Sequence, residues 1–196
     1  MIKLLLDIKH RCPWIWDAIE RLNGCLFRLR SRKPESVASA LPAKVPEGFR
    51  FLPVEAADIP ELSRFLSSQP EERLQYFRPH NFDEKSLRKR FDNPSFLMMK
   101  VRHEDDGRLA GYFFLRFFFV GAAVAGLIVA EEYTNQGVGR SIWAHCMDIC
   151  RQMRFRMFAT ISSRNVPSLK SCRYGTRMRI VKTMPDDYML VECKTK

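Results

Sequence analysis

The chain has 196 residues, of which 46% are hydrophobic and 28% are charged. This composition is typical of a globular protein, and the length is sufficient for one well-buried core. It excludes a helix that spans a bilayer, because the longest apolar stretch, residues 110–130, is interrupted by Arg116 and has the aromatic and β-branched content of two strands. The net charge of +11 favours an anionic partner: nucleic acid, an acidic membrane surface or a polyphosphate ligand.

Residues 1–33 form a basic extension in which apolar side chains recur at helical spacing. Pro13 is expected to separate a short first helix from a second helix over residues 14–30. Eight basic and three acidic residues give the extension a net charge of +5. Three arrangements fit this pattern: a helix docked on its own domain, a helix docked on a second copy in a homodimer, and a basic amphipathic helix in peripheral contact with an anionic membrane, for which Trp14 and Trp16 are suited.

The start of the chain is a poor match to a signal peptide, because Asp7 and Lys9 interrupt its apolar run. The six cysteines are scattered and form no Cys-x-x-Cys pattern, which indicates reduced thiols and a cytoplasmic location. His145, Cys146 and Cys150 are metal-binding residue types at helical spacing. Without a second cluster they indicate a buried helix face, and no metal site is expected.

Residues 34–48 contain three prolines with serine and alanine, which predicts a linker. Residues 49–196 are expected to form a single domain. Its predicted strands are 49–54, 95–101, 109–120, 122–129, 155–162, 177–184 and 187–194, and its predicted helices are 57–68, 70–77, 85–91, 138–153 and 167–173. Consecutive strands followed by a strand-helix-strand unit predict a mixed α/β sheet flanked by helices.

The predicted strand 109–120 is unusually aromatic, with six phenylalanine or tyrosine side chains. Aromatic residues are favoured in strands, so a buried central strand explains them. The alternative is a platform on which nucleic-acid bases stack. No recognised nucleic-acid motif accompanies it, and binding to nucleic acid is not expected.

The most informative segment is the turn between the strand ending at Val129 and the helix starting at Val138. Glycines at a strand-to-helix turn allow backbone to approach a ligand closely, and a helix start offers unpaired N–H groups and a positive dipole end. Arg140 adds a positive charge in the first turn. The segment therefore predicts a pyrophosphate site formed by the backbone of Asn135, Gln136, Gly137, Val138 and Gly139, together with Arg140.

Two common phosphate loops are excluded here. No Gly-Lys-Ser/Thr follows the glycines, and Ile142 stands where the dinucleotide fingerprint has its third glycine. The segment Thr134-Asn135-Gln136-Gly137-Val138-Gly139 resembles instead the Gln/Arg-x-x-Gly-x-Gly/Ala signature of the GNAT superfamily of acyl-CoA-dependent N-acyltransferases. Thr134 departs from it, because Gln or Arg is usual there.

A second segment supports this resemblance. Asn165-Val166-Pro167-Ser168 looks like the Asn-x-x-Ser/Ala helix start of the same family, whose Asn contacts the pantetheine arm of CoA. The same residues are also explained as an ordinary helix start, with Asn165 as the cap. The resemblance covers about residues 49 to 194 and implies a mixed, mostly antiparallel sheet, acetyl-CoA as co-substrate, and backbone contacts from Leu127, Ile128 and Val129 to pantetheine.

The resemblance leaves the acid and base less certain than the cofactor loop. The family often has a glutamate on the strand before the loop, whereas residues 121–125 contain no ionisable side chain. Its tyrosine acid would fall near Ser171 or Cys172, so Tyr174 is the expected acid, with simple packing as the alternative. His80, in a segment that looks like the Phe-x-Pro-His motif of some bacterial GNAT proteins, is the expected base, because an ordinary histidine titrates near neutrality.

These observations predict an N-acetyltransferase that moves an acetyl group from acetyl-CoA to a small-molecule amine, such as an amino sugar or a metabolite. One alternative is a GNAT-like module that binds CoA or a partner without turnover, which the missing glutamate favours. The other is a basic nucleic-acid-binding protein, which the net charge favours.

Overall fold

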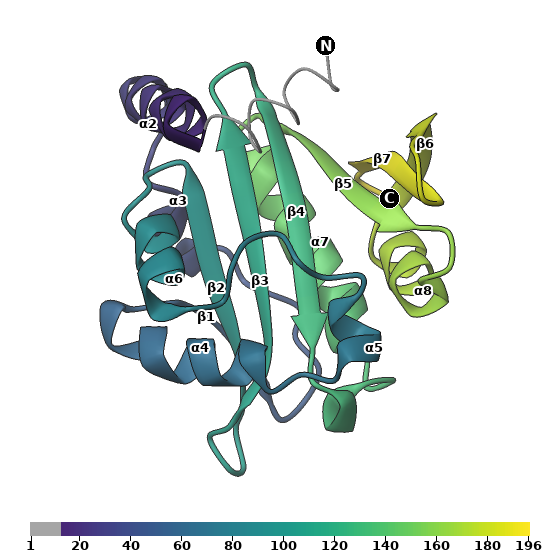
Figure 1. Ribbon diagram of the computed structural model, residues 1–196. Coiled ribbons are helices and arrows are strands. Elements are labelled where there is room, and N and C mark those ends of the chain that lie inside the picture. The colour runs from purple at the N-terminus through teal and green to yellow at the C-terminus, as the bar shows by residue number, and fades with distance from the viewer. Residues whose placement is uncertain (1–12) are drawn as a thin grey trace.

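The computed structural model describes residues 13–196, with side chains from residue 18 onward, so the expected first helix lies outside the described residues. A sheet with the strand order β1-β2-β3-β4-β5-β7-β6 runs through the protein (Figure 1). Its strands are β1 (Phe49–Pro53), β2 (Phe96–His103), β3 (Leu109–Phe118), β4 (Ala122–Val129), β5 (Arg156–Ser162), β6 (Arg177–Thr183) and β7 (Tyr188–Lys194). All neighbouring strands are antiparallel except β4 and β5, which confirms the predicted mixed, mostly antiparallel sheet.

Helices cover both faces of the sheet (Figure 1). They are α2 (Pro13–Arg30), α3 (Pro34–Ala40), α4 (Ile59–Ser67), α5 (Glu71–Leu74), α6 (Glu84–Phe91), α7 (Val138–Gln152) and α8 (Val166–Gly175), with short 3-10 turns η1 (Ala56–Asp58) and η2 (Glu131–Tyr133). Helices α4, α5 and α6 pack on one face, and α7 packs on the other. No helix of the described residues has the length and apolar character needed to cross a membrane.

The aromatic strand β3 is buried in the centre of the sheet, as predicted. Side chains alternate between the two faces of a strand, so Phe113 and Phe117 join the core beneath α7, whereas Tyr112 and Phe114 join the core beneath α4 and α6. All four are at most 5% exposed. Four of the five aromatic residues of β3 thus belong to the two cores, which supports a packing role for them.

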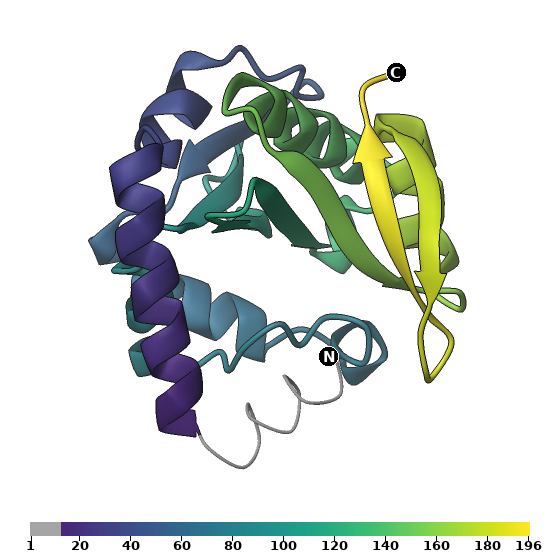
Figure 2. The same cartoon turned by 90° about the horizontal axis from the view of Figure 1, so that it is seen from above.

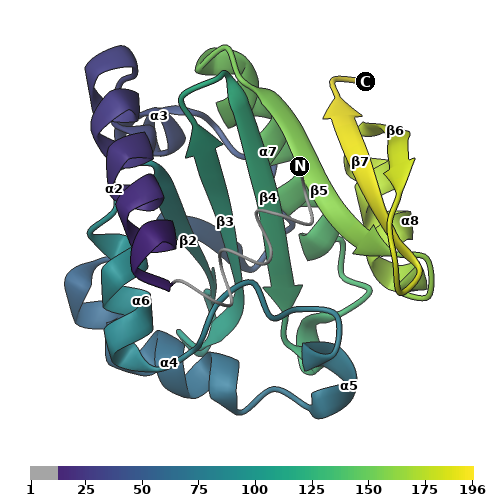
Figure 3. The ribbon, with the colours of Figure 1, turned by 45° about the horizontal axis from the view of Figure 1, so that its top comes forward.

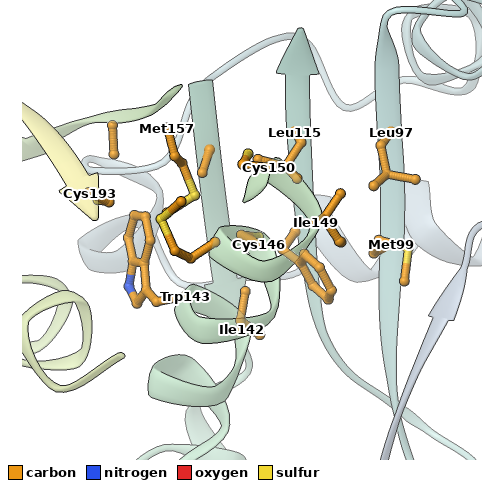
Figure 4. Packing of buried hydrophobic residues seen from close by; sticks show 14 of the residues in the cluster. Leu97, Met99, Leu115, Ile142, Trp143, Cys146, Ile149, Cys150, Met157 and Cys193 are labelled. Carbon is orange, nitrogen blue, oxygen red and sulfur yellow. The ribbon is translucent and has the colours of Figure 1, made fainter. Parts of the chain in front are cut away.

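The core beneath α7 is formed by residues at helical spacing. Figure 4 shows Ile142, Cys146 and Ile149 of α7 directed toward the sheet, where Leu97 and Leu115 lie. All five are fully buried or nearly so. Burying such side chains contributes roughly 1.5–3 kcal/mol each relative to exposure, so this face holds α7 firmly to the sheet. Cys146 is therefore a core residue, as expected.

Strands β4 and β5 pair over a short length only. Their parallel register extends from Ala122, opposite Arg156, to Val124, opposite Phe158. Beyond Val124 the two strands diverge, while β4 continues to pair with β3 along its whole length. The sheet therefore opens between β4 and β5 on the side where β4 ends, and this opening positions the site.

Helix α2 is docked on its own domain, across the end of β3 (Figures 2 and 3). Phe27 is 1% exposed and stacks on Phe117 with ring centroids 5.3 Å apart. Asn23 donates to the carbonyl of Phe117 at 2.9 Å and accepts from the N–H of Phe119 at 3.0 Å. The Asn23 side chain thus provides hydrogen-bond partners for backbone groups at the end of β3, where β2 no longer pairs with it. The described part of the extension is therefore docked on its own domain, and contact with a second copy or with a membrane stays a prediction.

Two expectations for the first half of the chain need correction. The predicted linker 34–48 begins with helix α3, whose Ala38 is 3% exposed and lies in the core beneath α7. Pro34 starts this helix at a position where its missing N–H is not needed. The predicted helix 70–77 is shorter and ends at Leu74, because Tyr76 and Phe77 belong to tight turns that follow it.

Candidate functional site

A cavity of about 630 Å³ fills the opening between β4 and β5. Its walls come from the end of β4, the turn before α7, the start of α7, the end of β5, helix α8 and the segment around α5. The lining includes Ala125, Gly126, Leu127, Ile128, Val129, Asn135, Gly137, Gly139, Arg140, Asn165, Ser168 and Tyr174. Most of the residues predicted to bind the cofactor are thus brought to one place.

The start of α7 supplies free amides to this cavity. The first bond within the helix is donated by the Ser141 N–H to the Gly137 carbonyl, at 3.1 Å. The N–H groups of Val138, Gly139 and Arg140 therefore have no acceptor within the helix. The helix has no side-chain cap and no acidic residue in its first turn, so the positive end of its dipole is not neutralised locally. This arrangement fits a phosphate group.

The backbone of the turn is specified by its residues. Gly137 has φ of 84°, in the left-handed region that favours glycine, and Asn135 has φ of 61°, which asparagine tolerates better than most residues. The side chain of Gln136 turns back and donates to the Glu132 carbonyl at 3.1 Å, and Val138 is buried in the core. Neither Gln136 nor Val138 lines the cavity with its side chain, so each can contribute only backbone.

The backbone of β4 is directed by its pairing with β3. The Ala130 N–H donates to the Ala110 carbonyl at 2.9 Å, and opposite residues of an antiparallel pair alternate between bonded and non-bonded positions. Ile128, which is opposite Tyr112, is therefore committed to β3. Leu127 and Val129 direct their backbone groups toward the opening. The expectation of a backbone contact from Ile128 is corrected: its backbone is paired with β3, and its side chain belongs to the core beneath α4 and α6.

Arg73 is a site residue that the sequence did not indicate. It reaches from α5 and donates to the carbonyl of Val129, on the wall of the cavity. Its buried Nε has no hydrogen-bond partner among the described residues. A buried donor without a partner is costly, so the Nε is an unfavourable feature of this conformation that the bond to Val129 and the position at the cavity wall accompany.

The position of Asn165 is compatible with both interpretations of its segment, an ordinary helix cap and a contact to the pantetheine arm. Its side-chain oxygen accepts from the Ser168 N–H at 3.1 Å, so it caps α8. It also lines the cavity, as does Ser168. The cap fixes the side chain in place, and its amide group remains at the cavity wall.

A second cavity, of about 380 Å³, adjoins the first. Tyr76, Phe77, Ala125, Gly126 and Thr160 line both cavities, so they mark the junction. A Cβ on Gly126 would lie 2.5 Å from the ring of Phe114, and the glycine thus allows that ring to cover the strand at this point. Tyr76 and Thr160 are the polar side chains at the junction.

The smaller cavity contains a cluster of charges from three elements. Glu20 of α2 forms ion pairs with Arg90 of α6 and with Arg116 of β3, the latter at 3.0 Å. The Glu20 side chain is 5% exposed, and those of Arg90 and Arg116 are 19% and 24% exposed. Burial lowers the pKa of Arg116 from its ordinary value, against the opposing effect of Glu20. No local motif could have indicated this cluster, because its members are far apart in the sequence.

His80 lies outside the lining of both cavities. Its ring packs among aromatic side chains, including Phe82 and Phe96, with centroids 5.8 Å and 6.0 Å away. Burial lowers the pKa of His80 to about 4, and its Nδ1 lies 2.8 Å from the Asn81 carbonyl oxygen. The structure therefore gives a packing role to His80 and does not support it as the base.

Tyr174 lines the larger cavity only and is 67% exposed. The neighbouring Gly175 packs against the first turns of α7, where a Cβ would lie 2.5 Å from the Arg140 carbonyl oxygen. Tyr174 thus lies near the start of α7 and is not among the residues at the junction. Cys172, which stands near the usual tyrosine position, is fully buried.

Within residues 13–196 no group of three or more histidine, cysteine, aspartate or glutamate side chains could hold a metal ion. Burial raises the pKa of Cys146 and of Cys150, which makes both poor thiolate ligands. The five described cysteines are free thiols.

Comparison with known proteins identifies the class to which this fold and site belong. The model of the acetyltransferase (GNAT) family matches residues 60–175. This is more than half of the chain, and the protein therefore belongs to the GNAT family. A comparison with curated proteins gives no significant match.

Solved structures of the same fold include several acetyltransferases. RimJ of Mycobacterium smegmatis in complex with CoA-disulfide is 20% identical, with a TM-score of 0.60 over 79% of this chain and 86% of that one. The ribosomal-protein-S5-alanine acetyltransferase of Vibrio fischeri is 12% identical, with a TM-score of 0.61 over 79% and 97%. The aminoglycoside acetyltransferase AAC(6')-Ib in complex with coenzyme A and kanamycin is 10% identical, with a TM-score of 0.59 over 76% and 95%. At these identities the likeness shows the fold.

Proposed function

We propose that this protein is an N-acetyltransferase that transfers an acetyl group from acetyl-CoA to a small-molecule amine. The observation that carries the proposal is the pair of joined cavities. One has free helix amides at its end, which suit the phosphates of CoA, and the other adjoins it at the point where β4 and β5 separate. A donor and an acceptor can thus enter from different sides and meet at the junction, which is the proximity that a transfer reaction requires.

In this proposal the amides of residues 138–140 and the guanidinium of Arg140 hold the pyrophosphate. The backbone of Leu127 and of Val129 and the side chain of Asn165 hold the pantetheine arm. The bound thioester supplies the acetyl group. The nitrogen of the acceptor bonds to the acetyl carbon, the bond from that carbon to sulfur breaks, and the proton lost by the amine ends on the thiol.

The chain's own contribution to proton transfer centres on Tyr76 and Thr160, the polar side chains that line both cavities. The substrate-facing positions of β4 carry Val124, Gly126 and Ile128, so this strand offers no carboxylate. A thiolate with an ordinary pKa near 8.5 is a good leaving group, and the amine must lose a proton as the new bond forms. Tyr76 is placed to take part in it or to orient water.

The test is release of CoA thiol from acetyl-CoA in the presence of a panel of primary amines. The expected result is amine-dependent release that Gly137→Glu abolishes. Binding of CoA to the wild-type protein without release for any amine would favour the alternative of a CoA-binding module without turnover.

A further inference from the structure

The smaller cavity has a charge pattern that selects among amines. The charged side chains of the described residues that line it are three arginines and one glutamate, namely Arg78, Arg90, Arg116 and Glu20. Arg78 is held outward by an exposed ion pair with Glu71. Arg90 and Arg116 are more buried and converge on Glu20.

The rest of the wall is largely aromatic and aliphatic, with the uncharged polar side chains Gln75, Tyr76, Thr160 and Tyr188 among its residues. Phe77, Phe96, Phe114 and Phe118 line the smaller cavity, and Val124 lies opposite Arg116 in the register of β3 and β4. Gly126, opposite Phe114, marks the junction with the larger cavity. Gly126, at the junction, and Val124 are two residues apart on β4 and therefore lie on the same face of the sheet. Arg116 of β3 is opposite Val124, so it lies next to the junction on that face.

From this placement we propose that the acceptor is an amino carboxylate, such as an α-amino acid with an apolar side chain. Its amine lies at the junction, and its carboxylate is bound by Arg90 and Arg116. This inference rests on the proposed acetyl transfer and names the substrate class of the same site. Guanidinium groups bind carboxylates with paired hydrogen bonds, which fixes the orientation of the ligand as well as its position.

Glu20 is a positioning residue in this site. It holds both guanidiniums on the wall, so they are oriented before the acceptor arrives. The residue comes from α2, which precedes the part of the chain that matches the family model. Helix α2 is thus a specificity element of this chain. An acceptor with several positive charges would meet the arginines and be disfavoured.

The experiment compares phenylalanine with phenylalaninamide and phenethylamine, and leucine with leucinamide and 3-methylbutylamine. Each set keeps the amine and the side chain and changes only the carboxylate. The wild-type protein is expected to prefer each acid over its amide at least about tenfold in kcat/KM, mainly through KM, since a site built around a polar group discriminates against ligands that lack it. Arg116→Gln is expected to reduce that preference to about twofold or less and to leave the KM for acetyl-CoA unchanged.

Glu20→Gln removes the charge that orients the arginines and keeps the shape of the side chain. We expect it to weaken the preference for the acid and to leave CoA affinity unchanged. Arg50→Gln is the matched control, because Arg50 forms an exposed ion pair with Glu104 at 2.8 Å on the far edge strand. It is expected to retain the wild-type preference. Thermal melting of each variant shows whether the fold is retained.

Outcomes that would overturn the inference are distinct from failure of the proposed function. Equal turnover of acids, amides and amines by the wild-type protein overturns it, as does an equal loss for all three in Arg116→Gln. If no amine is turned over, the proposed function fails, and the inference is then tested by calorimetric binding of phenylalanine and phenylalaninamide to the CoA-loaded protein. Tighter binding of the acid that Arg116→Gln removes supports it, and equal binding overturns it.

Discussion

The two cavities are built by different means. The larger one has free backbone amides, proposed to bind phosphate, from consecutive residues at the start of α7, whereas the smaller one takes its charges from Glu20, Arg90 and Arg116 on three separate elements. Backbone geometry at a strand-to-helix turn depends on a few adjacent residues. A cluster of side chains depends on the whole fold. A site made of backbone groups can therefore stay the same in relatives whose side chains differ. A site made of side chains can change its ligand when a single residue is substituted.

The sharpest way to separate the two cavities is Gly137→Glu. It places a carboxylate beside the free amides and forces a side chain onto a backbone with φ of 84°. We expect CoA affinity to fall by about 1,000-fold, or roughly 4 kcal/mol, measured by calorimetry. Gly107→Glu is the matched control, because Gly107 also has positive φ, of 69°, and its Cβ would meet nothing within 4 Å. Equal losses in both variants would contradict the assignment of the turn.

The second prediction concerns helix α2, which supports the smaller cavity. Phe27→Ala should lower the free energy of unfolding by about 3–5 kcal/mol, because it leaves a void between Phe117 and Phe155 in the core. Denaturant unfolding measures the loss. CoA affinity of the folded variant should be unchanged, and Leu29→Ala, at a position that is 86% exposed, is the control with little effect on stability. A stable Phe27→Ala variant would show that α2 is not part of the core.

The third prediction separates a packing role for His80 from a catalytic one. The pKa of His80 is about 4 in the folded protein, and its ordinary value is 6.5. Between these two pH values the unfolded chain binds a proton at His80 and the folded protein does not. Stability from this residue is thus complete above pH 6.5 and is lost as pH falls toward 4, by roughly 3 kcal/mol in total. His80→Gln should flatten this part of the curve of unfolding free energy against pH. A loss of turnover at pH 8 by more than about 100-fold, with the fold intact, would restore His80 as the base.

The smallest expected effect tests the junction itself. Tyr76→Phe should lower kcat by about tenfold, since it removes a hydroxyl where the two cavities meet, whereas Tyr174→Phe should change kcat by no more than about twofold. Steady-state kinetics with saturating acetyl-CoA measures both. The opposite order would place the reacting atoms nearer α8 and support Tyr174 as the acid.

Local patterns predicted most of the strands and helices, and the tight turn before α7, well. Strand β4 has the predicted limits, and the start of α7 at Val138 followed from the glycines before it. The helix α3 was missed because the three prolines of residues 34–48 are typical of a linker, whereas in the structure Pro34 starts the helix and Ala38 is buried in the core.

The acceptor side could not be predicted, because its residues meet only in the folded chain. Glu20 looked like one of three acidic residues on a basic extension, and Arg116 looked like an interruption of an apolar run. His80 was favoured for its ordinary pKa and for a short motif resemblance, and neither determines where the side chain lies relative to a cavity. Arg73 gave no signal, since it is one basic residue in a short polar helix.

The short contact between β4 and β5 has a mechanical consequence. The pairing of β4 with β5 is confined to the stretch from Ala122 to Val124. The sheet therefore consists of two plates, β1 to β4 and β5 to β7, that share only this short stretch of strand pairing. A ligand wedged between them bridges the plates and adds to the cohesion of the whole protein, because anything that binds only the folded form shifts unfolding to higher temperature. Thermal melting with and without CoA would therefore report on the joint between the plates as well as on occupancy.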